Sequence, residues 1–254
     1  MQRLPLYSTP ASKNYKDMDK NVYHCTTQKT ASQWFRMFYS DPLFYKYSGL
    51  TASDFRRKEP KQTGYIFVPL YANYDAYLIW EKPDNHLAYF VIRDPRDITV
   101  SWYFSIRYSH SVMGDVIPKY RPMFNKMSVK DGLVKSIDFL HNGGYYKRLK
   151  SWVDNAPDIV YRYEDFTANS IDFMRRLMRF MDIAMPNEVL QILCNKYSFR
   201  RLSGRRKGVE DNKRQYRKGI AGDYKNYFDT ELLDYFNKIT DNIAEALNYK
   251  GEDN

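Results

Sequence analysis

Hydrophobic residues along this chain fall into short apolar runs that alternate with stretches of helical periodicity. Residues 22–27 (VYHCTT) form a run with strand character, and a helical pattern that includes Trp34 and Phe38 follows directly. A second run spans 65–70 (YIFVPL), and 87–92 (LAYFVI) is apolar throughout. An uninterrupted apolar run is typical of a parallel strand that is buried on both faces. The first part of the chain therefore predicts strand–helix units around a parallel sheet.

The alternation continues in the rest of the chain. Asp94 followed by Pro95 indicates a helix start, with Asp as N-cap and Pro at the first helical position. Residues 158–163 (DIVYRY) predict another strand, after which an amphipathic helix is expected, and one last helix is expected near the carboxyl end. The apolar faces of these two helices are Met174, Leu177, Met178 and Met181, and then Leu232, Phe236, Ile239, Ile243 and Leu247.

This order of elements predicts an α/β fold with a central parallel sheet flanked by helices. In such a doubly wound sheet the ligand lies beyond the carboxyl ends of the strands, where helix N-termini converge. No Pro-, Gly- or Ser-rich linker and no internal repeat divides the sequence. Residues 1–254 are therefore expected to form a single domain, with an irregular segment over 1–20.

The two cysteines give no sign of a disulfide framework or a zinc site. Cys25 and Cys194 lie far apart and lack a CxxC or Cys/His ligand spacing. The amino-terminal stretch has no apolar leader core, and nowhere do about 18 apolar residues run together. We therefore expect a cytoplasmic protein without a transmembrane segment.

The formal charge of +10 indicates an anionic partner. Basic residues crowd residues 200–218, where only Glu210 and Asp211 interrupt them. A nucleotide, a nucleic acid, an acidic glycan or a lipid surface would each fit this charge. The basic stretch is thus compatible with a nucleic-acid-binding protein as well as with an enzyme of anionic substrates.

The first strand–helix junction, CTTQKTASQWF, has the chemistry of a phosphate site. Lys29, Thr30, Ser32 and Gln33 lie between the strand and the helix, where an ammonium, hydroxyls and free backbone N–H groups bind anions well. The sequence is not GxxxxGK[ST], so an ATP or GTP site of the Walker type is poorly supported. An ordinary structural turn is the alternative interpretation of this loop.

Two further stretches carry cations at strand or loop ends. In VIRDPRDITVSWY, Arg93 closes the buried strand and Ser101 lies about two helical turns beyond Asp94. A guanidinium there could bind a phosphate in bidentate fashion, or it could pair with Asp94 or Asp97. In YRKGIAGDYKNYF, residues 217–219 could wrap a phosphate, because Gly allows a close backbone approach, or could form a flexible basic loop.

Together these stretches resemble the sulfotransferases that use 3′-phosphoadenosine-5′-phosphosulfate (PAPS), in particular the cytosolic and bacterial branch. QKTASQW resembles the family's phosphosulfate loop PKSGTTW, RDPRDITVSWY its 3′-phosphate segment RNPKDxxVSYY, and YRKGIAGDYKNYF its RKGxxGDWKNxF segment. VYRYEDF and YSFRRL are similar to the family's YEDL strand end and TSFxxM stretch. The resemblance extends from about Tyr23 to Phe228 and implies a P-loop-nucleotide-hydrolase-like sulfotransferase fold.

The resemblance also implies the positions that bind PAPS and its product, 3′-phosphoadenosine-5′-phosphate (PAP). The 5′-phosphosulfate end and the approach to adenine would be held by Lys29, Thr30, Ala31, Ser32, Gln33 and Trp34. The 3′-phosphate would be bound by Arg93, Ser101, Arg217, Lys218 and Gly219. Tyr163 would contact the adenosine, and the base would be lined by Tyr197, Ser198 and Phe199; 200–228 would form a basic loop that covers the nucleotide.

The family reaction is an in-line displacement at sulfur, with charge that develops as in phosphoryl transfer. Lys29 would stabilise the bridging oxygen of the leaving phosphate, and Ser32 would hold the transferred group, with no metal required.

The chain departs from the family pattern at the loop and at the general base. Gln28 stands where the pattern has Pro and Ala31 where it has Gly, so the backbone path of the loop is expected to differ. The family's catalytic His is missing from IFVPLYANYDAY, which contains Tyr71 and Asp75. Asp75 is therefore the candidate base, whereas His24 is expected in the core and His86 in a loop.

The acceptor and the oligomeric state stay open at this stage. A small-molecule, lipid or glycan acceptor is expected, and no nucleic acid, since no RRM, KH, zinc-finger or basic-zipper pattern is present. A basic nucleic-acid-binding protein and a small-molecule kinase on a related α/β scaffold are the alternative functions. KITDNIAEAL does not reproduce the family's KxxxTVxxxE dimer element, so that dimer is not predicted.

Overall fold

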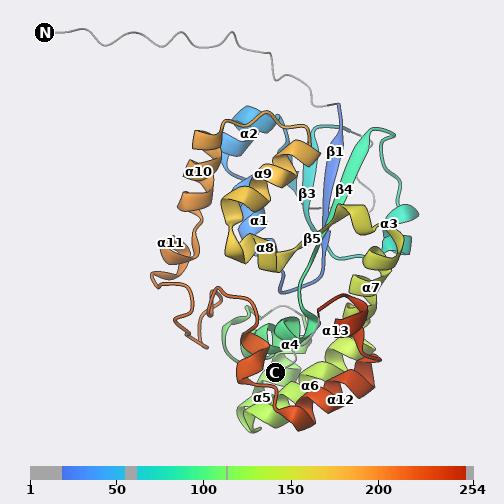
Figure 1. The fold of residues 1–254 in the computed structure, drawn as a ribbon, viewed down its shortest axis with the longest axis vertical. Helices are drawn as coiled ribbons and strands as arrows, with labels where there is room; N and C mark the ends of the chain where they lie inside the picture. Colours follow the sequence, from blue (N-terminus) through green and yellow to red (C-terminus); the bar gives the residue numbers. More distant parts are fainter. Residues whose placement is uncertain (1–18, 55–61, 113, 250–254) are drawn as a thin grey trace, which may run out of the picture.

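The computed structural model describes residues 19–54, 62–112 and 114–249, and its centre is a five-stranded sheet (Figure 1). All the strand pairs are parallel, as the sequence predicts, and the strands lie in the order β2-β3-β1-β4-β5. Most of the predicted amino-terminal segment lies outside the described residues. The strands are β1 (Asn21–Thr26), β2 (Thr51–Ser53), β3 (Tyr65–Leu70), β4 (His86–Ile92) and β5 (Val160–Arg162).

Helices cover both faces of this sheet because successive side chains of a strand point to opposite sides. In β4, Tyr89 and Val91 join one apolar cluster, whereas Phe90 and Ile92 join the other. The first cluster lies under the helices α1 (Ser32–Tyr39), α2 (Pro42–Ser48), α8 (Tyr163–Ala168), α9 (Ser170–Phe180) and α10 (Asn187–Lys196). The second packs against α3 (Tyr74–Leu78), α4 (Pro95–Phe104), α5 (Val116–Asn125), α6 (Val129–Asn142), α7 (Tyr145–Asn155), α12 (Thr230–Thr240) and α13 (Ile243–Ala246). The predicted α/β architecture is confirmed.

Two predicted elements differ from the structure. The strand expected over 158–163 is shorter, because Pro157–Ile159 forms a 3₁₀ turn (η2) and Tyr163 already begins α8. The prediction of one last helix is wrong. The chain forms two helices, α12 and α13, which are separated at Asp241 and Asn242, whose φ angles of 53° and 52° are left-handed. Leu232, Phe236, Ile243 and Leu247 nevertheless share one core cluster.

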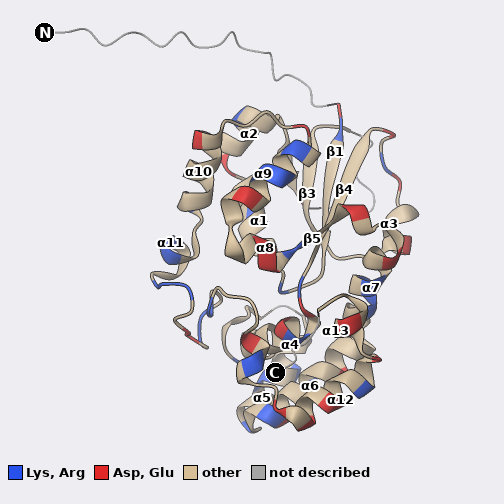
Figure 2. Cartoon of the chain, viewed as in Figure 1, with Lys and Arg blue, Asp and Glu red and all other residues tan. Residues whose placement is uncertain are grey.

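The carboxyl ends of the strands and the segment after α10 meet at one side of the sheet. α1 begins a few residues after β1, α4 follows β4, and α8 follows β5. Asp94 caps α4 as predicted, accepting a hydrogen bond from the Arg96 N–H at 2.9 Å. The chain then passes through α11 (Phe199–Ser203) and a loop rich in lysine and arginine to the 3₁₀ turn η3 (Asp223–Asn226) (Figure 2). None of the helices in the described part of the chain is long and apolar enough to span a bilayer.

Candidate active site

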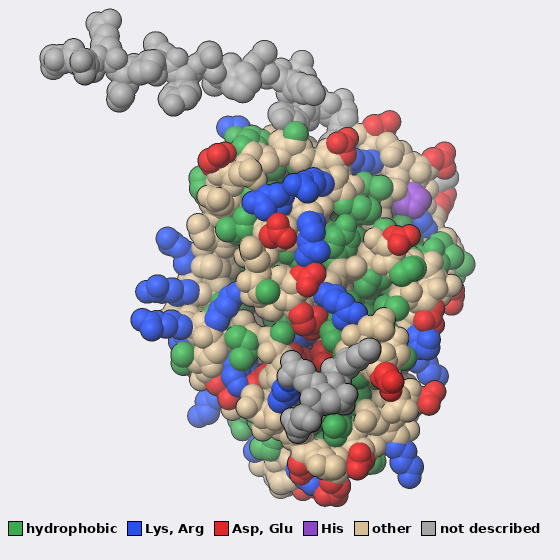
Figure 3. Space-filling model, viewed as in Figure 1, with side chains coloured by type: hydrophobic (Ala, Val, Ile, Leu, Met, Phe, Trp, Pro, Cys, Tyr) green, Lys and Arg blue, Asp and Glu red, His purple; other side chains and the backbone are tan. Residues whose placement is uncertain are grey.

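A cavity of about 780 Å³ lies where the β1, β4 and β5 ends meet the loop after α11. Basic side chains project from the edge around α11 in the space-filling view (Figure 3). The structure brings most of the predicted site residues together in this cavity: it is lined by Lys29, Ala31, Ser32, Gln33, Trp34, Arg93, Ser101, Tyr163, Ser198, Phe199, Arg217, Lys218 and Gly219. Residues from three distant parts of the sequence therefore converge on one space.

The loop between β1 and α1 presents backbone N–H groups to the cavity. Lys29 and Ala31 have φ angles of 71° and 62°, whereas Thr30 between them is not left-handed. Such alternation turns successive N–H groups toward one point and forms an anion-binding concavity. No side chain caps the start of α1, so its first N–H groups can also bind an anion.

Thr30 shapes this loop from within. Its side chain is fully buried, and its hydroxyl donates to the Thr27 carbonyl at 2.7 Å. Thr26 donates in turn to the Val91 carbonyl at 2.8 Å, which ties the end of β1 to β4. The Thr30 side chain thus fixes the loop conformation, and only its backbone is left to face a ligand.

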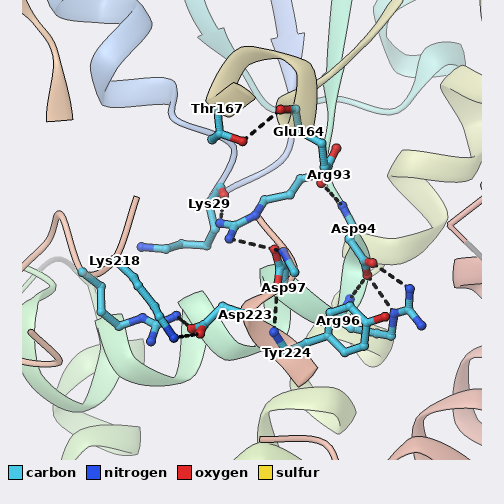
Figure 4. Close-up of polar contacts among 12 residues, drawn as sticks. Lys29, Arg93, Asp94, Arg96, Asp97, Glu164, Thr167, Lys218, Asp223 and Tyr224 are labelled. Atoms are coloured by element: carbon cyan, nitrogen blue, oxygen red, sulfur yellow. Dashed lines mark hydrogen bonds and ion pairs between the residues drawn. The ribbon is translucent and has the colours of Figure 1, made fainter. Parts of the chain in front are cut away.

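Lys29 lies in a strongly cationic environment. Burial, and then the nearby charges of Arg93 and Arg217, lower the pKa of Lys29 to about 8. Figure 4 shows its side chain beside the guanidinium of Arg93. Because like charges crowd here, a bound anion would relieve their repulsion.

Arg93 connects the loop to the following helix. Its Nη1 donates to the Lys29 carbonyl at 2.9 Å, its Nη2 donates to Asp97 Oδ2 at 3.2 Å, and its guanidinium carbon lies 4.4 Å from the centre of the Tyr163 ring. The ion pair with Asp97 that the sequence left open is therefore present. It coexists with a place in the cavity lining, so the ion pair does not remove Arg93 from the predicted phosphate site.

Asp97 also anchors the carboxyl-terminal loop. Its carboxylate, only 1% exposed, accepts hydrogen bonds from the Gly222 N–H at 2.9 Å and the Tyr224 N–H at 2.8 Å (Figure 4). One buried carboxylate thereby fixes the Arg93 side chain and the backbone of η3.

Arg217 and Lys218 are held by acidic partners behind the cavity. Lys218 donates to Asp223 (Figure 4), and Arg217 donates to Asp223 and also pairs with Glu210. Burial alone would raise the pKa of Asp223, but Lys218 and Arg217 hold it below its ordinary value. The two cations are thus positioned by ion pairs rather than lying in a loose loop.

Gly219 occupies a place that a side chain would disturb. Its φ is 71°, and a Cβ atom there would lie 2.4 Å from the ring of Phe199, which also lines the cavity. The structure thus gives two reasons for glycine at this position: its backbone angle and its close approach to the Phe199 ring.

Trp34, Phe166 and Phe199 form an aromatic wall of the cavity. It contains residues that are predicted to lie near the adenine. The Trp34 ring packs 4.6 Å from that of Phe166, and its Nε1 donates to the Tyr197 carbonyl at 2.7 Å. Tyr197 itself is not among the lining residues, because its hydroxyl turns away to donate to Asp41 at 2.8 Å. Tyr197 therefore supports Trp34 from behind through its backbone, and the structure does not bring its side chain into the cavity with Ser198 and Phe199.

Asp75, the candidate general base, is not brought together with the other predicted site residues. Asp75 is exposed on α3 and is absent from the cavity lining, which contains no Asp or Glu among the described residues. His24 is buried, as expected, and burial lowers its pKa to about 3. His86, expected in a loop, is the first residue of β4, and its Nδ1 lies 2.7 Å from the Pro83 carbonyl.

Two side chains at the cavity were not among the predicted site residues. Tyr71 follows β3, and its hydroxyl donates to Ser32 Oγ at 3.0 Å; His110 follows the π-helical turn η1 (Ser105–Ser109). The signal for Tyr71 was its position just after a strand, at the same sheet edge as Lys29. Within the described residues no cluster of three or more His, Cys, Asp or Glu could hold a metal ion.

Comparison with known proteins gives a consistent family. The sequence profile of the Sulfotransferase domain matches residues 87–250, well over half of the chain. A flavonol sulfotransferase-like protein of Flaveria bidentis is 27% identical over 176 residues, 60% of this chain and 52% of its own length. Sulfotransferase 1B1 of Canis lupus familiaris is 24% identical over 173 residues, 63% of this chain and 54% of its own. The chain thus spans about half the length of the curated relatives it matches.

Solved structures show the same fold. A mouse sulfotransferase, SULT7A1, in complex with PAP has a TM-score of 0.63 at 14% identity and covers 92% of this chain and 86% of its own. Retinol dehydratase in complex with retinol and PAP has a TM-score of 0.56 at 15% identity, with 89% and 81% covered. These similarities confirm the predicted sulfotransferase fold.

Gly219→Ala tests the aromatic wall. We expect the new methyl group to displace Phe199 and weaken PAP binding by about tenfold or more, since a 1.4 kcal/mol loss corresponds to a factor of ten. Gly204→Ala is the matched control, because φ there is 73° but a Cβ would meet nothing within 4 Å. Calorimetric titration of both variants with PAP measures the two Kd values. An equal loss of PAP affinity in the two variants would contradict the role of the Phe199 contact.

Proposed function

We propose, from the premise that this chain belongs to the sulfotransferase domain family, that it transfers a sulfuryl group from PAPS to a hydroxyl or amine of an acceptor and releases PAP. The observation that carries the proposal is the convergence of Lys29, Arg93, Arg217 and Lys218 on one cavity that no described carboxylate lines. A nucleotide with phosphate groups at both ends of its ribose matches cations at two places in one cavity.

We assign the two ends of the nucleotide to these two groups of residues. The 5′-phosphosulfate would bind the loop over 28–32 and the start of α1, where N–H groups and the Lys29 ammonium are available. The 3′-phosphate would be bound by Arg93, Ser101, Arg217, Lys218 and Gly219. The adenosine would lie against Trp34, Tyr163, Ser198 and Phe199.

The chemistry then follows from charge development. An oxygen of the acceptor forms a bond to sulfur while the bond from sulfur to the 5′-phosphate oxygen breaks, so negative charge grows on that bridging oxygen. The Lys29 ammonium stabilises this charge, and Ser32 holds the transferred group by a hydrogen bond. The Tyr71 hydroxyl, already bonded to Ser32, is placed to orient the acceptor hydroxyl. One proton is released per turnover, and it leaves the cavity to solvent.

The proposal includes a small-molecule acceptor, a cytoplasmic location and one domain over residues 1–254. Two buried free thiols, Cys25 and Cys194, support a reducing compartment.

Thermal unfolding with different ligands tests the nucleotide. PAP at about 100 times its Kd should stabilise the protein by about 2.7 kcal/mol and raise its Tm. ATP, which lacks a 3′-phosphate, and a single-stranded oligonucleotide should cause little change at equal concentration. A shift with ATP as large as that with PAP would favour a kinase, and a larger shift with the oligonucleotide would favour a nucleic-acid-binding protein.

Lys29→Met tests the catalytic assignment. Removal of a group that stabilises transition-state charge typically lowers kcat by about 10²- to 10³-fold. Lys126→Met is the control, because Lys126 is exposed and does not line the cavity, and it should leave kcat unchanged. Both variants are to be compared in single-turnover assays with radiolabelled PAPS. Undiminished turnover in a folded Lys29→Met protein would remove Lys29 from the mechanism.

The lowered pKa of Lys29 also predicts how PAP affinity depends on pH. Phosphate anions favour the ammonium, so the complex has a higher Lys29 pKa than the free protein, where it is about 8. The complex therefore holds more protons above pH 8, and affinity falls there by up to about tenfold per pH unit. Titrations between pH 7 and 9.5 should show this decline in the wild type and a flatter profile in Lys29→Met. The same slope in both proteins would show that another group titrates.

A further inference from the structure

The cavity has a second polar region beside the start of α1. Tyr71 donates to Ser32 Oγ at 3.0 Å, and Ser32 is the first residue of α1, directly after the Lys29 loop. In the proposed reaction the sulfuryl group lies at this helix start. An acceptor must therefore place its nucleophile near Tyr71, so the charges around Tyr71 act on the acceptor rather than on adenosine.

Two arginines carry positive charge at the part of the cavity that contains Tyr71: Arg36 among its lining residues and Arg148 bonded to the lining residue Gln28. Burial raises the pKa of this phenol, while the positive charges of Arg36 and Arg148 oppose the rise. Arg36 lies one helical turn beyond Ser32 and lines the cavity. Arg148, on α7, is not itself a lining residue, but its Nη1 donates to Gln28 Oε1 at 3.1 Å, and Gln28 lines the cavity. The Arg148 guanidinium therefore lies directly behind this part of the cavity wall. The acceptor side thus has its own cations, separate from those near η3.

These arginines are only partly neutralised. Arg36 pairs with Asp54, whose side chain is 61% exposed. Arg148 donates hydrogen bonds to the neutral oxygens of Thr27, at 3.4 Å, and Gln28, and its guanidinium lies 5.4 Å from the centre of the Tyr145 ring. Within the described ranges no ion pair joins it to an Asp or Glu. Arg148 is half-buried, and burial lowers its pKa. A half-buried cation with neutral partners has lost part of its solvation free energy. Attraction to a bound anion would offset that loss.

We propose that the acceptor carries an anionic group, such as a carboxylate, sulfate or phosphate, in addition to the nucleophile, and that Arg148 and Arg36 bind it beside Tyr71. This inference rests on the proposed sulfotransferase function and names the class of its acceptor. A guanidinium prefers such planar or trigonal oxyanions because it offers parallel N–H donors. The proposal also gives Gln28 a function, because its amide oxygen holds Arg148 at the cavity.

Matched acceptor pairs test this preference. We would compare 3-(4-hydroxyphenyl)propionate with its amide, and glucuronate with glucose, as acceptors with PAPS and the full chain. The anionic member of at least one pair should have a kcat/KM about tenfold higher, the effect of one charge-assisted hydrogen bond. Arg148→Gln should remove this preference while leaving the neutral member unchanged. Lys147→Gln, an exposed neighbour on α7, is the control and should preserve the preference.

Binding measurements test the same preference for an anionic acceptor when turnover is too slow for kcat/KM to be compared. Titration of the PAP complex with each compound should show tighter binding of the anionic member, lost in Arg148→Gln. Equal binding within every pair, or an equal loss for both members in Arg148→Gln, would overturn the proposal. The second result would mean that Arg148 acts on the transferred group. Unchanged PAP binding by Arg148→Gln separates these outcomes from a failure of the sulfotransferase assignment, which would abolish the PAP response of the wild type.

Discussion

The buried carboxylate of Asp97 is the interaction on which the arrangement of the site depends. It accepts hydrogen bonds from the Arg93 guanidinium and from the N–H groups of Gly222 and Tyr224, which lie more than a hundred residues later in the chain. A carboxylate so completely buried is stable only while its donors are present, and loss of one partner typically costs about 3–5 kcal/mol. The end of β4 and the loop that carries Arg217 and Lys218 are therefore fixed relative to each other before any ligand binds.

The acidic groups of the site lie behind its cations rather than among the lining residues. Asp223 and Glu210 hold Arg217, and Asp97 holds Arg93, while no Asp or Glu of the described chain lines the cavity itself. This arrangement lowers the cost of gathering cations in the free protein, since Arg93, Arg217 and Lys218 each have a carboxylate partner on the protein side. It also leaves the other side of each guanidinium or ammonium for an anion. The free protein can in this way be stable and strongly anion-selective at once.

The sequence predicts the secondary-structure elements whose signals lie in neighbouring residues. It fails for features that are determined by contacts between residues far apart in the chain. The βα junctions at Lys29 and Arg93 follow from apolar runs and a capping Asp-Pro pair, and both are present. The short edge strand β2 gave no signal, because three residues show no periodicity. The final helix was predicted whole because its apolar residues keep a helical spacing through Phe236 and Ile243, although Asp241 breaks the helix. Asp75 was chosen over Tyr71 by chemical type, and only the fold reveals that Tyr71 reaches Ser32.

The two departures from the family pattern in the first loop have different physical consequences. Ala31 adopts a left-handed angle that glycine would adopt without strain, a difference of about 1 kcal/mol, so this exchange affects stability more than ligand contacts. Gln28, where the pattern has Pro, supplies a side-chain oxygen that Pro lacks, and Arg148 uses it. Pro at this position would leave Arg148, among the described residues, with one hydrogen bond, to Thr27 at 3.4 Å, which is too long for a strong one. Gln28 and Arg148 therefore act as a pair. The replacement of Pro by Gln, which weakens the family resemblance, is the one that fixes a positive charge beside the proposed acceptor region of the cavity.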